Sequence, residues 1–203
     1  MPGTRQRRTR GEGERLRAEL VTAAIDLLLE PQPLPAPSLR AIARACGVAP
    51  SAVYMHFASQ DALNYAVITE LFGRLRAELD AADPQAASPA ERLDALLGAY
   101  LTWAENHPGA YQLLFERPDP LDTEGEGPGL DLLDRLARLL PDIDPQVPGT
   151  DLQARRATAL RIWCAVHGVA SLRIHKSSAP WAATARSDAR ALVAGLAGLL
   201  ADT

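Results

Sequence analysis

The sequence predicts an all-α protein, and three observations favour this fold class. Almost every segment of the 203 residues repeats its apolar side chains every three or four positions, as helices do. Alternating runs rich in valine, isoleucine and threonine, which are typical of strands, are absent from the sequence. Prolines and capping residues divide the chain into about nine helical segments. We expect a three-helix N-terminal helix-turn-helix domain and a C-terminal helical domain.

Charge is distributed unevenly along the chain. Residues 1–60 contain eight arginines and five acidic residues, a net charge of +3, whereas residues 61–203 contain thirteen basic and twenty acidic residues, a net charge of −7. This asymmetry predicts two domains with different partners, which we place at residues 1–59 and 60–203. The basic N-terminal part can approach phosphate groups, and the acidic remainder is repelled by them.

Composition disfavours several other classes of protein. The longest apolar run, residues 162–172, is too short and too broken to cross a bilayer core of about 30 Å. No apolar segment follows the arginine-rich start, so we predict no secretory signal and a cytoplasmic location. Cys46 and Cys164 fit neither a disulfide framework nor a zinc site, and we expect both to be small core residues. We expect no metal and no cofactor.

The first three helices have recognisable start and stop signals. The first is expected over residues 14–29, where leucines recur on one face until a proline-rich segment ends the helix. The second begins after Ser38 and directs Ile42 and Ala43 inward. Gly47 ends this helix, and a short turn leads to Pro50 at the first position of a third helix that is expected to reach residue 57.

Angular positions on the third helix indicate how it can bind DNA. At about 100° per residue, one narrow stripe is expected to face the core and comprises Pro50, Val53 and Phe57. The opposite face, which is expected to meet base edges in a major groove, comprises Ser51, Ala52 and Met55. Tyr54 and His56 lie on the two flanks, where a hydroxyl group and an imidazole can donate hydrogen bonds to phosphate.

Further capping signals predict the C-terminal helices. Ser59 is expected to cap a helix that extends to about residue 79, and Ser88 opens a capping box for a helix over residues 88–105. Shorter helices are expected from Pro108 and over residues 130–140, with a mobile loop at residues 116–129 between them. Thr150 is expected to open the longest helix, to residue 174, and the last helix spans residues 182–200.

The helix-turn-helix segment resembles the TetR/AcrR family of transcriptional regulators. The resemblance is carried by residues 38–43, 45, 47–48, 53–57 and 59–63. It implies that the helix containing Tyr54 is the recognition helix, that Tyr54 and His56 contact backbone phosphates, and that Ser38 and Arg40 contact phosphates or bases. Gln60 stands where the family commonly has a lysine. Because Ala49 and Ala52 replace hydroxyl-bearing residues, base readout can shift to Arg40, Ser51, the N-terminal arm or DNA shape.

A second resemblance concerns the C-terminal domain. Residues 163–168 resemble the Trp-x-x-x-His-Gly motif of one TetR C-terminal domain type, and residues 106–115 resemble a segment of the same type. This resemblance implies a homodimer built from the last two helices, a ligand pocket within the helical bundle, and repression that a ligand relieves. Aromatic residues and one histidine are the candidates for lining that pocket, although most of them would also suit the core of any bundle: Tyr100, Trp103, Tyr111, Phe115, Trp163 and His167.

The last two helices also carry apolar surface suited to a dimer interface. Residues 160–172 are apolar around nearly the whole helix, and glycines at positions 168, 195 and 198 permit close approach of another helix. The expected stripe of the last helix comprises Leu192, Val193, Leu196, Leu199 and Leu200. A two-fold four-helix interface fits this pattern, and completion of the monomer core is the alternative.

The sequence therefore predicts a ligand-responsive transcriptional repressor rather than an enzyme. Two copies would place their recognition helices in successive major grooves of a palindromic operator, about 34 to 36 Å apart, and an unidentified small molecule would release them. An N-terminal arm containing Arg5, Arg7, Arg8 and Arg10 either enters the minor groove or remains a solvated tail. The alternatives are a helical adaptor for protein partners and a hydrolase that uses His167 with Ser171, although no carboxylate near this pair in the sequence orients it.

Overall fold

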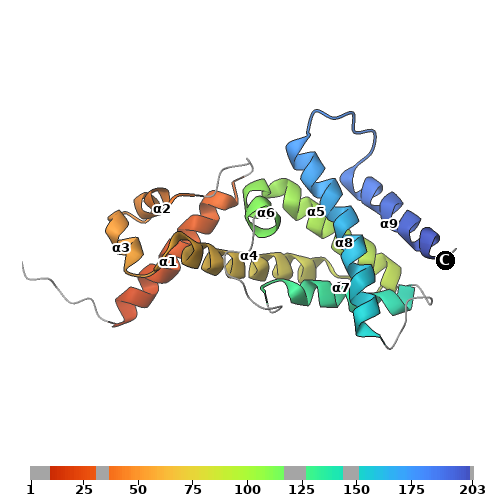
Figure 1. The fold of residues 1–203 in the computed structure, drawn as a ribbon, viewed down its shortest axis with the longest axis horizontal. Helices are drawn as coiled ribbons and strands as arrows, with labels where there is room; N and C mark the ends of the chain where they lie inside the picture. The colour runs from red at the N-terminus through yellow and green to blue at the C-terminus, as the bar shows by residue number, and fades with distance from the viewer. Residues whose placement is uncertain (1–9, 31–36, 117–126, 144–150, 202–203) are drawn as a thin grey trace, which may run out of the picture.

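The structure is a computed structural model that describes residues 10–30, 37–116, 127–143 and 151–201. Within these residues it contains helices only, which confirms the predicted fold class. The helices are α1 (Arg10–Leu28), α2 (Leu39–Ala45), α3 (Pro50–Tyr54), α4 (Gln60–Ala82), α5 (Pro89–Asn106), α6 (Pro108–Phe115), α7 (Leu130–Ile143), α8 (Leu152–His175) and α9 (Ala185–Ala201). Figure 1 shows an elongated molecule with α1–α3 at one end and α5–α9 at the other.

The three N-terminal helices form a small unit around its own core. The Ser38 hydroxyl caps α2 by accepting a hydrogen bond from the Ala41 amide at 3.2 Å. Gly47 adopts a φ of 65°, which lets the chain turn sharply into α3 without steric strain. Apolar side chains from all three helices and from the start of α4 are completely or almost completely buried here: Leu20, Ile25, Ile42, Val53 and Leu63.

Helix α3 is shorter than its sequence predicts. α3 ends at Tyr54 rather than at residue 57, because the amides of Met55 and His56 bond to carbonyl groups three residues earlier and tighten the last turn. Phe57 is nevertheless buried, as expected. Pro50 was expected on the core-facing stripe, but it is exposed at the first position of the helix.

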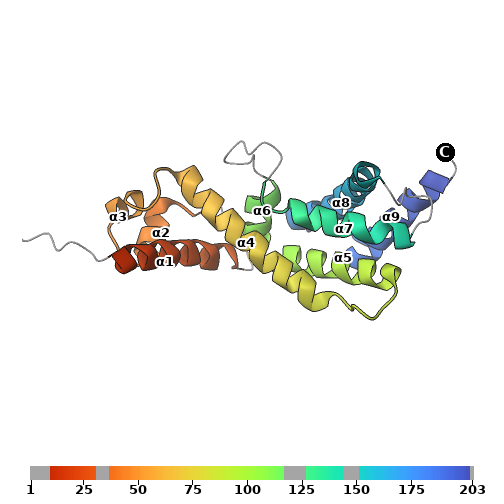
Figure 2. The same ribbon diagram turned by 90° about the horizontal axis from the view of Figure 1, so that it is seen from below.

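Helix α4 belongs to both halves of the molecule. Ser59 caps it as predicted, and its buried stripe contains Leu63, Val67, Leu71 and Leu75. The helix packs against α1 near one end and against α5 and α6 further along. Figure 2 shows α4 running from the α1–α3 unit into the C-terminal bundle. A rigid helix therefore connects the two ends.

A buried carboxylate holds the end of α4 to two other helices. The Asp83 side chain has no solvent exposure and accepts bidentate hydrogen bonds from Arg92 of α5, at 2.8 and 3.0 Å. It also accepts one from Arg135 of α7 at 2.7 Å. These hydrogen bonds and charges keep the pKa of Asp83 well below its ordinary value. The carboxylate thereby fixes the ends of α4, α5 and α7 to one another.

The remaining helices complete the C-terminal bundle. The capping box at Ser88 and Glu91 is present as predicted. Helix α8 begins after Asp151, whose carboxylate accepts hydrogen bonds from the amides of Gln153 and Ala154. Asp151 is therefore the N-cap in place of the predicted Thr150, which lies outside the described residues. Asp94 of α5 pairs with Arg190 and Arg186 of α9, and these partners lower its pKa to about 2.

Several apolar side chains of α8 and α9 face solvent in the single chain. Leu160, Leu172 and Leu192 are 44%, 53% and 48% exposed. Cys164 is also exposed, which corrects the expectation that both cysteines are core residues, because it lies on the same outward face of α8 as Leu160. None of the described helices is long and apolar enough to cross a membrane.

We predict that the substitution Asp83→Asn lowers the free energy of unfolding by about 3 kcal/mol, because it leaves two arginines without their buried counter-charge. Chemical denaturation at pH 7 measures the change. The matched control is Asp80→Asn, since the Asp80 side chain is 61% exposed and Arg135 is its one ion-pair partner among the described residues. Equal effects of the two substitutions would contradict the central role of Asp83.

Candidate DNA interface and ligand cavity

The predicted DNA-contacting residues gather at the free end of the molecule. Ser38 and Arg40 lie at the start of α2, and both are exposed. Ser51 lies in the first turn of α3 and is also exposed. Because the Ser38 hydroxyl oxygen already accepts the capping hydrogen bond, its O–H group remains able to donate to an acceptor such as a phosphate.

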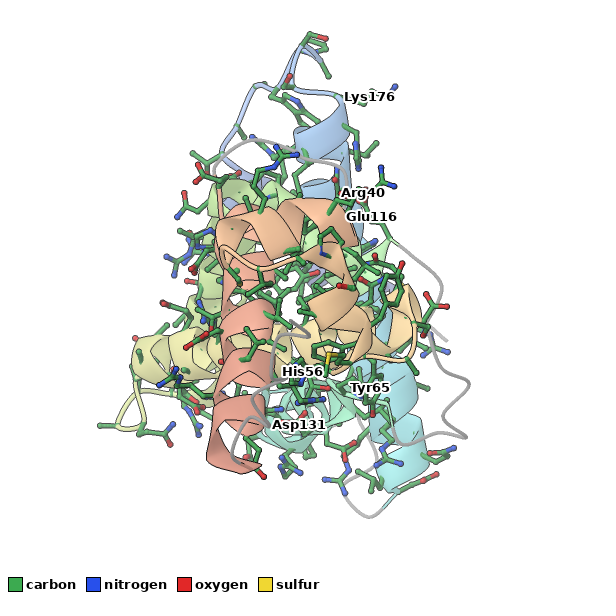
Figure 3. The ribbon with its side chains drawn as sticks, turned by 90° about the vertical axis from the view of Figure 1, so that its left-hand side faces the viewer. Arg40, His56, Tyr65, Glu116, Asp131 and Lys176 are labelled. Carbon is green, nitrogen blue, oxygen red and sulfur yellow. The ribbon has the colours of Figure 1, made fainter. Side chains whose placement is uncertain are left out.

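The end of α3 presents the largest outward-facing side chains of this unit. Tyr54 is 60% exposed and Met55 is 80% exposed, so neither side chain is part of the core of the single chain. His56 and Ala52 are half-buried. A Cβ atom added at Gly13 of α1 would lie 3.8 Å from Cε1 of His56, so the imidazole lies against α1. Figure 3 shows Arg40 and His56 on the end of the molecule that faces the viewer.

Two further residues near this surface, Gln60 and Arg17, form contacts that helical periodicity does not predict. Gln60 donates a hydrogen bond to Asn64 of its own helix at 3.0 Å, so its side chain is directed along α4. The guanidinium group of Arg17 lies 4.8 Å from the centre of the Phe57 ring and brings an exposed positive charge from α1 beside the recognition helix. Periodicity places Arg17 on the polar face of α1 but does not reveal this stacking. Arg5, Arg7 and Arg8 lie outside the described residues, as does the Arg10 side chain.

The C-terminal bundle contains a partly open cavity of about 460 Å³. Its walls come from α4, α5, α6, α7 and α8, together with the residues just before α7. The lining residues are Phe72, Leu75, Leu79, Leu96, Leu97, Tyr100, Leu114, Phe115, Gly127, Pro128, Gly129, Leu130, Leu132, Leu133, Arg135, Leu136, Trp163 and Val166. The volume is within the range that suits a small organic ligand.

Of the six residues expected to line a ligand pocket, three line the cavity and three do not. Tyr100, Phe115 and Trp163 line the cavity. Tyr111 and His167 lie immediately behind this wall, with their rings stacked at 5.4 Å between centres. Trp103 faces away from the cavity and packs edge-on against His107, near the junction with α1. The leucines of α4, α5 and α7 were missed, although the regular apolar stripe of α7 is a signal that could have identified its contribution.

A chain of hydrogen bonds passes from the cavity wall into the core. The Trp163 indole donates to the Tyr100 hydroxyl at 3.3 Å, and that hydroxyl donates to the Tyr111 hydroxyl at 3.5 Å. The Tyr111 hydroxyl lies 2.5 Å from Nδ1 of His167. Burial raises the pKa of Tyr100 to about 12, raises the pKa of Tyr111 further, and lowers the pKa of His167 below its ordinary value. All four side chains are therefore uncharged at neutral pH.

The arrangement around His167 is not that of a hydrolase. Ser171 donates its hydroxyl hydrogen to Glu116 at 2.6 Å, and the second carboxylate oxygen of Glu116 lies 2.6 Å from Nε2 of His175. His167 is instead bound to Tyr111. No hydrogen bond joins His167 to Ser171 among the described residues, so the pair does not form a base and nucleophile.

The short exposed helix α3, its neighbour α2 and a separate helical bundle have the arrangement of a helix-turn-helix DNA-binding protein with a second, helical domain. Comparison with protein families identifies this class more narrowly. Residues 20–67 match the family described as bacterial regulatory proteins, tetR family, and residues 93–196 match the tetracyclin repressor-like C-terminal domain. The chain belongs to the TetR family of DNA-binding transcriptional regulators, a family of regulators that bind DNA operators and are not enzymes.

Solved structures share the whole fold. A protein of unknown function from Rhodococcus sp. RHA1 is 25% identical, with 98% of each chain covered and a TM-score of 0.69. A TetR-like transcriptional regulator from the same organism is 22% identical over 95% of this chain and 98% of that chain, with a TM-score of 0.61. A tetR-family regulator from Streptomyces coelicolor is 20% identical over 93% and 82%, with a TM-score of 0.63.

We predict that Tyr111→Phe lowers the free energy of unfolding by about 1 to 2 kcal/mol, because it removes the acceptor for Tyr100 and the partner of His167 within a buried site. Thermal or chemical denaturation measures this loss. Tyr65→Phe is the matched control, since Tyr65 is only half-buried and its hydroxyl forms no hydrogen bond with the described residues. If the two variants were equally stable, the buried hydrogen-bond chain would contribute nothing to stability.

Proposed function

We propose that this TetR-family protein is a repressor that binds a palindromic operator as a homodimer and is released when a small molecule enters the cavity of the C-terminal bundle. The observation that carries the proposal is the connection of two surfaces by one helix. Helix α4 packs against α1 beside the recognition unit and lines the cavity with Phe72, Leu75 and Leu79. A change in the cavity can therefore change the position of the DNA-binding end.

For the DNA complex, we assign residues 1–59 to the DNA-binding domain and residues 60–203 to ligand binding and dimerisation. Tyr54, His56 and Ser38 contact phosphates, and Gln60 lies close to them. Ser51, Ala52 and Met55 face base edges, and Arg40 contacts a phosphate or a base from the start of α2. This assignment is supported by the exposure of Arg40, Ser51, Tyr54 and Met55. Two copies place their α3 helices about 34 to 36 Å apart on the operator.

For the homodimer, we assign the outward faces of α8 and α9 to the interface. Leu160, Cys164, Gly168 and Leu172 follow one another at intervals of four along α8, and three of them are exposed. A Cβ atom added at Gly168 or Gly195 meets nothing within 4 Å. Because none of the described helices uses the close approach that these glycines permit, a helix of a second copy is the natural partner.

We further assign the C-terminal domain to the Trp-x-x-x-His-Gly type, and the positions of the motif residues give it a physical purpose. Trp163 lines the cavity, and His167 binds Tyr111 behind the wall. Gly168 follows on the outward face of α8. The motif therefore joins the ligand site to the proposed dimer face within six residues of one helix.

Ligand signals have a second route to the DNA-binding end through α6. At one end of α6, Leu114 and Phe115 line the cavity. At the other end, the Nδ1 atom of His107 lies 3.1 Å from the backbone carbonyl oxygen of Leu29, the residue that follows α1. A shift of α6 that accompanies ligand binding would therefore move α1 as well as α4. Ligand relieves repression only by the extent to which it prefers the arrangement that does not fit DNA.

Operator binding tests the DNA assignment. With a site selected from random DNA, we predict that Arg40→Ala weakens binding about tenfold and reduces the salt dependence of binding, because a cation near phosphate is lost. Tyr54→Phe weakens binding by a smaller factor and leaves the salt slope unchanged, because it removes only a neutral hydrogen bond. Fluorescence anisotropy across a range of salt concentrations measures both effects.

The matched control for Arg40→Ala is Arg138→Ala, which removes an exposed arginine from α7 at the other end of the molecule. This variant should bind the operator as the unaltered protein does. Affinity that ignores salt, or equal losses in the two arginine variants, would refute the assignment of α2 and α3 to the DNA interface.

Sedimentation or light scattering tests the dimer assignment. We predict that Leu160→Asp converts the dimer to a monomer, because it places a charge in an interface that is apolar on both sides. Met55→Asp is the control, since Met55 is even more exposed but lies directly after α3, at the other end of the molecule. A Leu160→Asp protein that remains dimeric would exclude this face of α8 from the interface.

A further inference from the structure

The polar side chains in the wall of the C-terminal cavity already have partners within the protein. Most of its wall consists of leucines and of the aromatic rings of Phe72, Tyr100, Phe115 and Trp163. Among the described lining residues, Arg135 is the one with a charged side chain, and Tyr100 and Trp163 supply the side-chain hydroxyl and indole N–H groups. The chemistry of the ligand therefore depends on whether these three side chains are free to bind it.

The charge of Arg135 is already neutralised. Its Nη1 lies 2.6 Å from Asp80, and its Nη2 lies 2.7 Å from Asp83. Asp83 also binds Arg92, so two arginines and two aspartates form one cluster with no net charge. An anionic ligand beside Arg135 would meet two carboxylates that already hold the guanidinium group, and it would have to displace one of them.

The hydrogen-bonding groups of the wall are likewise engaged. The Trp163 indole has a single N–H group and donates it to Tyr100. The Tyr100 hydroxyl hydrogen is directed to Tyr111, which in turn binds His167. Among the described residues, the one charge of the wall is thus paired, and the indole N–H and the tyrosine O–H are already donated within the protein.

From this balance we infer that the ligand is an electrically neutral, largely apolar molecule that contains flat ring or alkyl surface. The inference rests on the proposed function, since it takes the cavity to be the ligand site, and it adds the chemical class of the ligand. A charged group buried in this cavity would lose its hydration without gaining a partner, whereas apolar surface gains contacts with leucine and aromatic side chains. The composition of the wall therefore favours neutral ligands over charged ones.

Two fluorescent probes with the same ring skeleton test the inference. N-phenyl-1-naphthylamine is neutral, and 8-anilinonaphthalene-1-sulfonate adds one sulfonate group to it. With the full-length protein, we expect saturable binding of one neutral probe per chain and at least tenfold weaker binding of the sulfonate. Equal or tighter binding of the sulfonate, together with its loss in Arg135→Gln, would overturn the inference and identify an anion site.

Energy transfer from tryptophan locates the probe without disturbing the fold. Trp163 lines the cavity, and Trp103 and Trp181 do not. We therefore expect Trp163→Phe to reduce the transfer to the neutral probe more than Trp181→Phe, the matched control, does. Leu133→Trp, which fills the cavity from α7, should reduce binding at least tenfold, whereas Leu152→Trp at the start of α8 should not. Equal transfer in the Trp163→Phe and Trp181→Phe proteins would overturn the assignment.

Operator binding separates failure of the inference from failure of the proposed function. A neutral probe that binds in the cavity and weakens operator binding supports both. If the sulfonate alone binds and releases DNA, the proposed function stands and the neutral class is wrong. If neither probe binds while the operator is still recognised, the inference is overturned together with the ligand-release part of the proposal, and DNA recognition remains.

Discussion

The organisation of this protein depends on one buried carboxylate. Asp83 ends α4, and its side chain is held by Arg92 of α5 and Arg135 of α7. Burying a carboxylate is costly unless its partners are correctly placed, so the ends of these three helices have little freedom to separate. Arg135 also forms part of the cavity wall. The ion-pair cluster that fixes the far end of α4 and the cavity that we assign to the ligand therefore share a side chain. A ligand that moves α7 must act against this cluster.

The two contacts between the cavity and the DNA-binding end differ in their mechanical character. Helix α4 is continuous and capped, and it carries any displacement along its whole length. Helix α6 is short, and its link to α1 depends on the hydrogen bond between His107 and the Leu29 carbonyl. Both helices contribute aromatic side chains to the same wall, and the rings of Phe72 and Phe115 meet edge to face at 5.7 Å. A ligand that separates these rings would act on both connections at once.

Signals that act between near neighbours in the chain were predictable from the sequence. The cap at Ser59, the capping box at Ser88 and the turn at Gly47 need only a few adjacent residues, and each is present. The direction of each aromatic ring depends on which helix crosses it. Trp103 and Trp163 look equally suited to a pocket in the sequence, yet only Trp163 faces the cavity. Cys164 was misjudged for a related reason, because helical periodicity shows that α8 is apolar all round but not which side the chain itself covers.

A neutral cavity places a limit on how the ligand can act. Because the charge of Arg135 is paired and the Trp163 and Tyr100 donors are engaged within the protein, differential affinity must come from shape and packing rather than from new ion pairs. Packing energy is sensitive to small displacements, since dispersion contacts weaken within less than an ångström of separation. A ligand of the right volume can therefore favour one separation of α4 and α7 over another. The same pairing leaves no charge of the described wall without a partner, so the wall itself does not require a charged ligand for its stability.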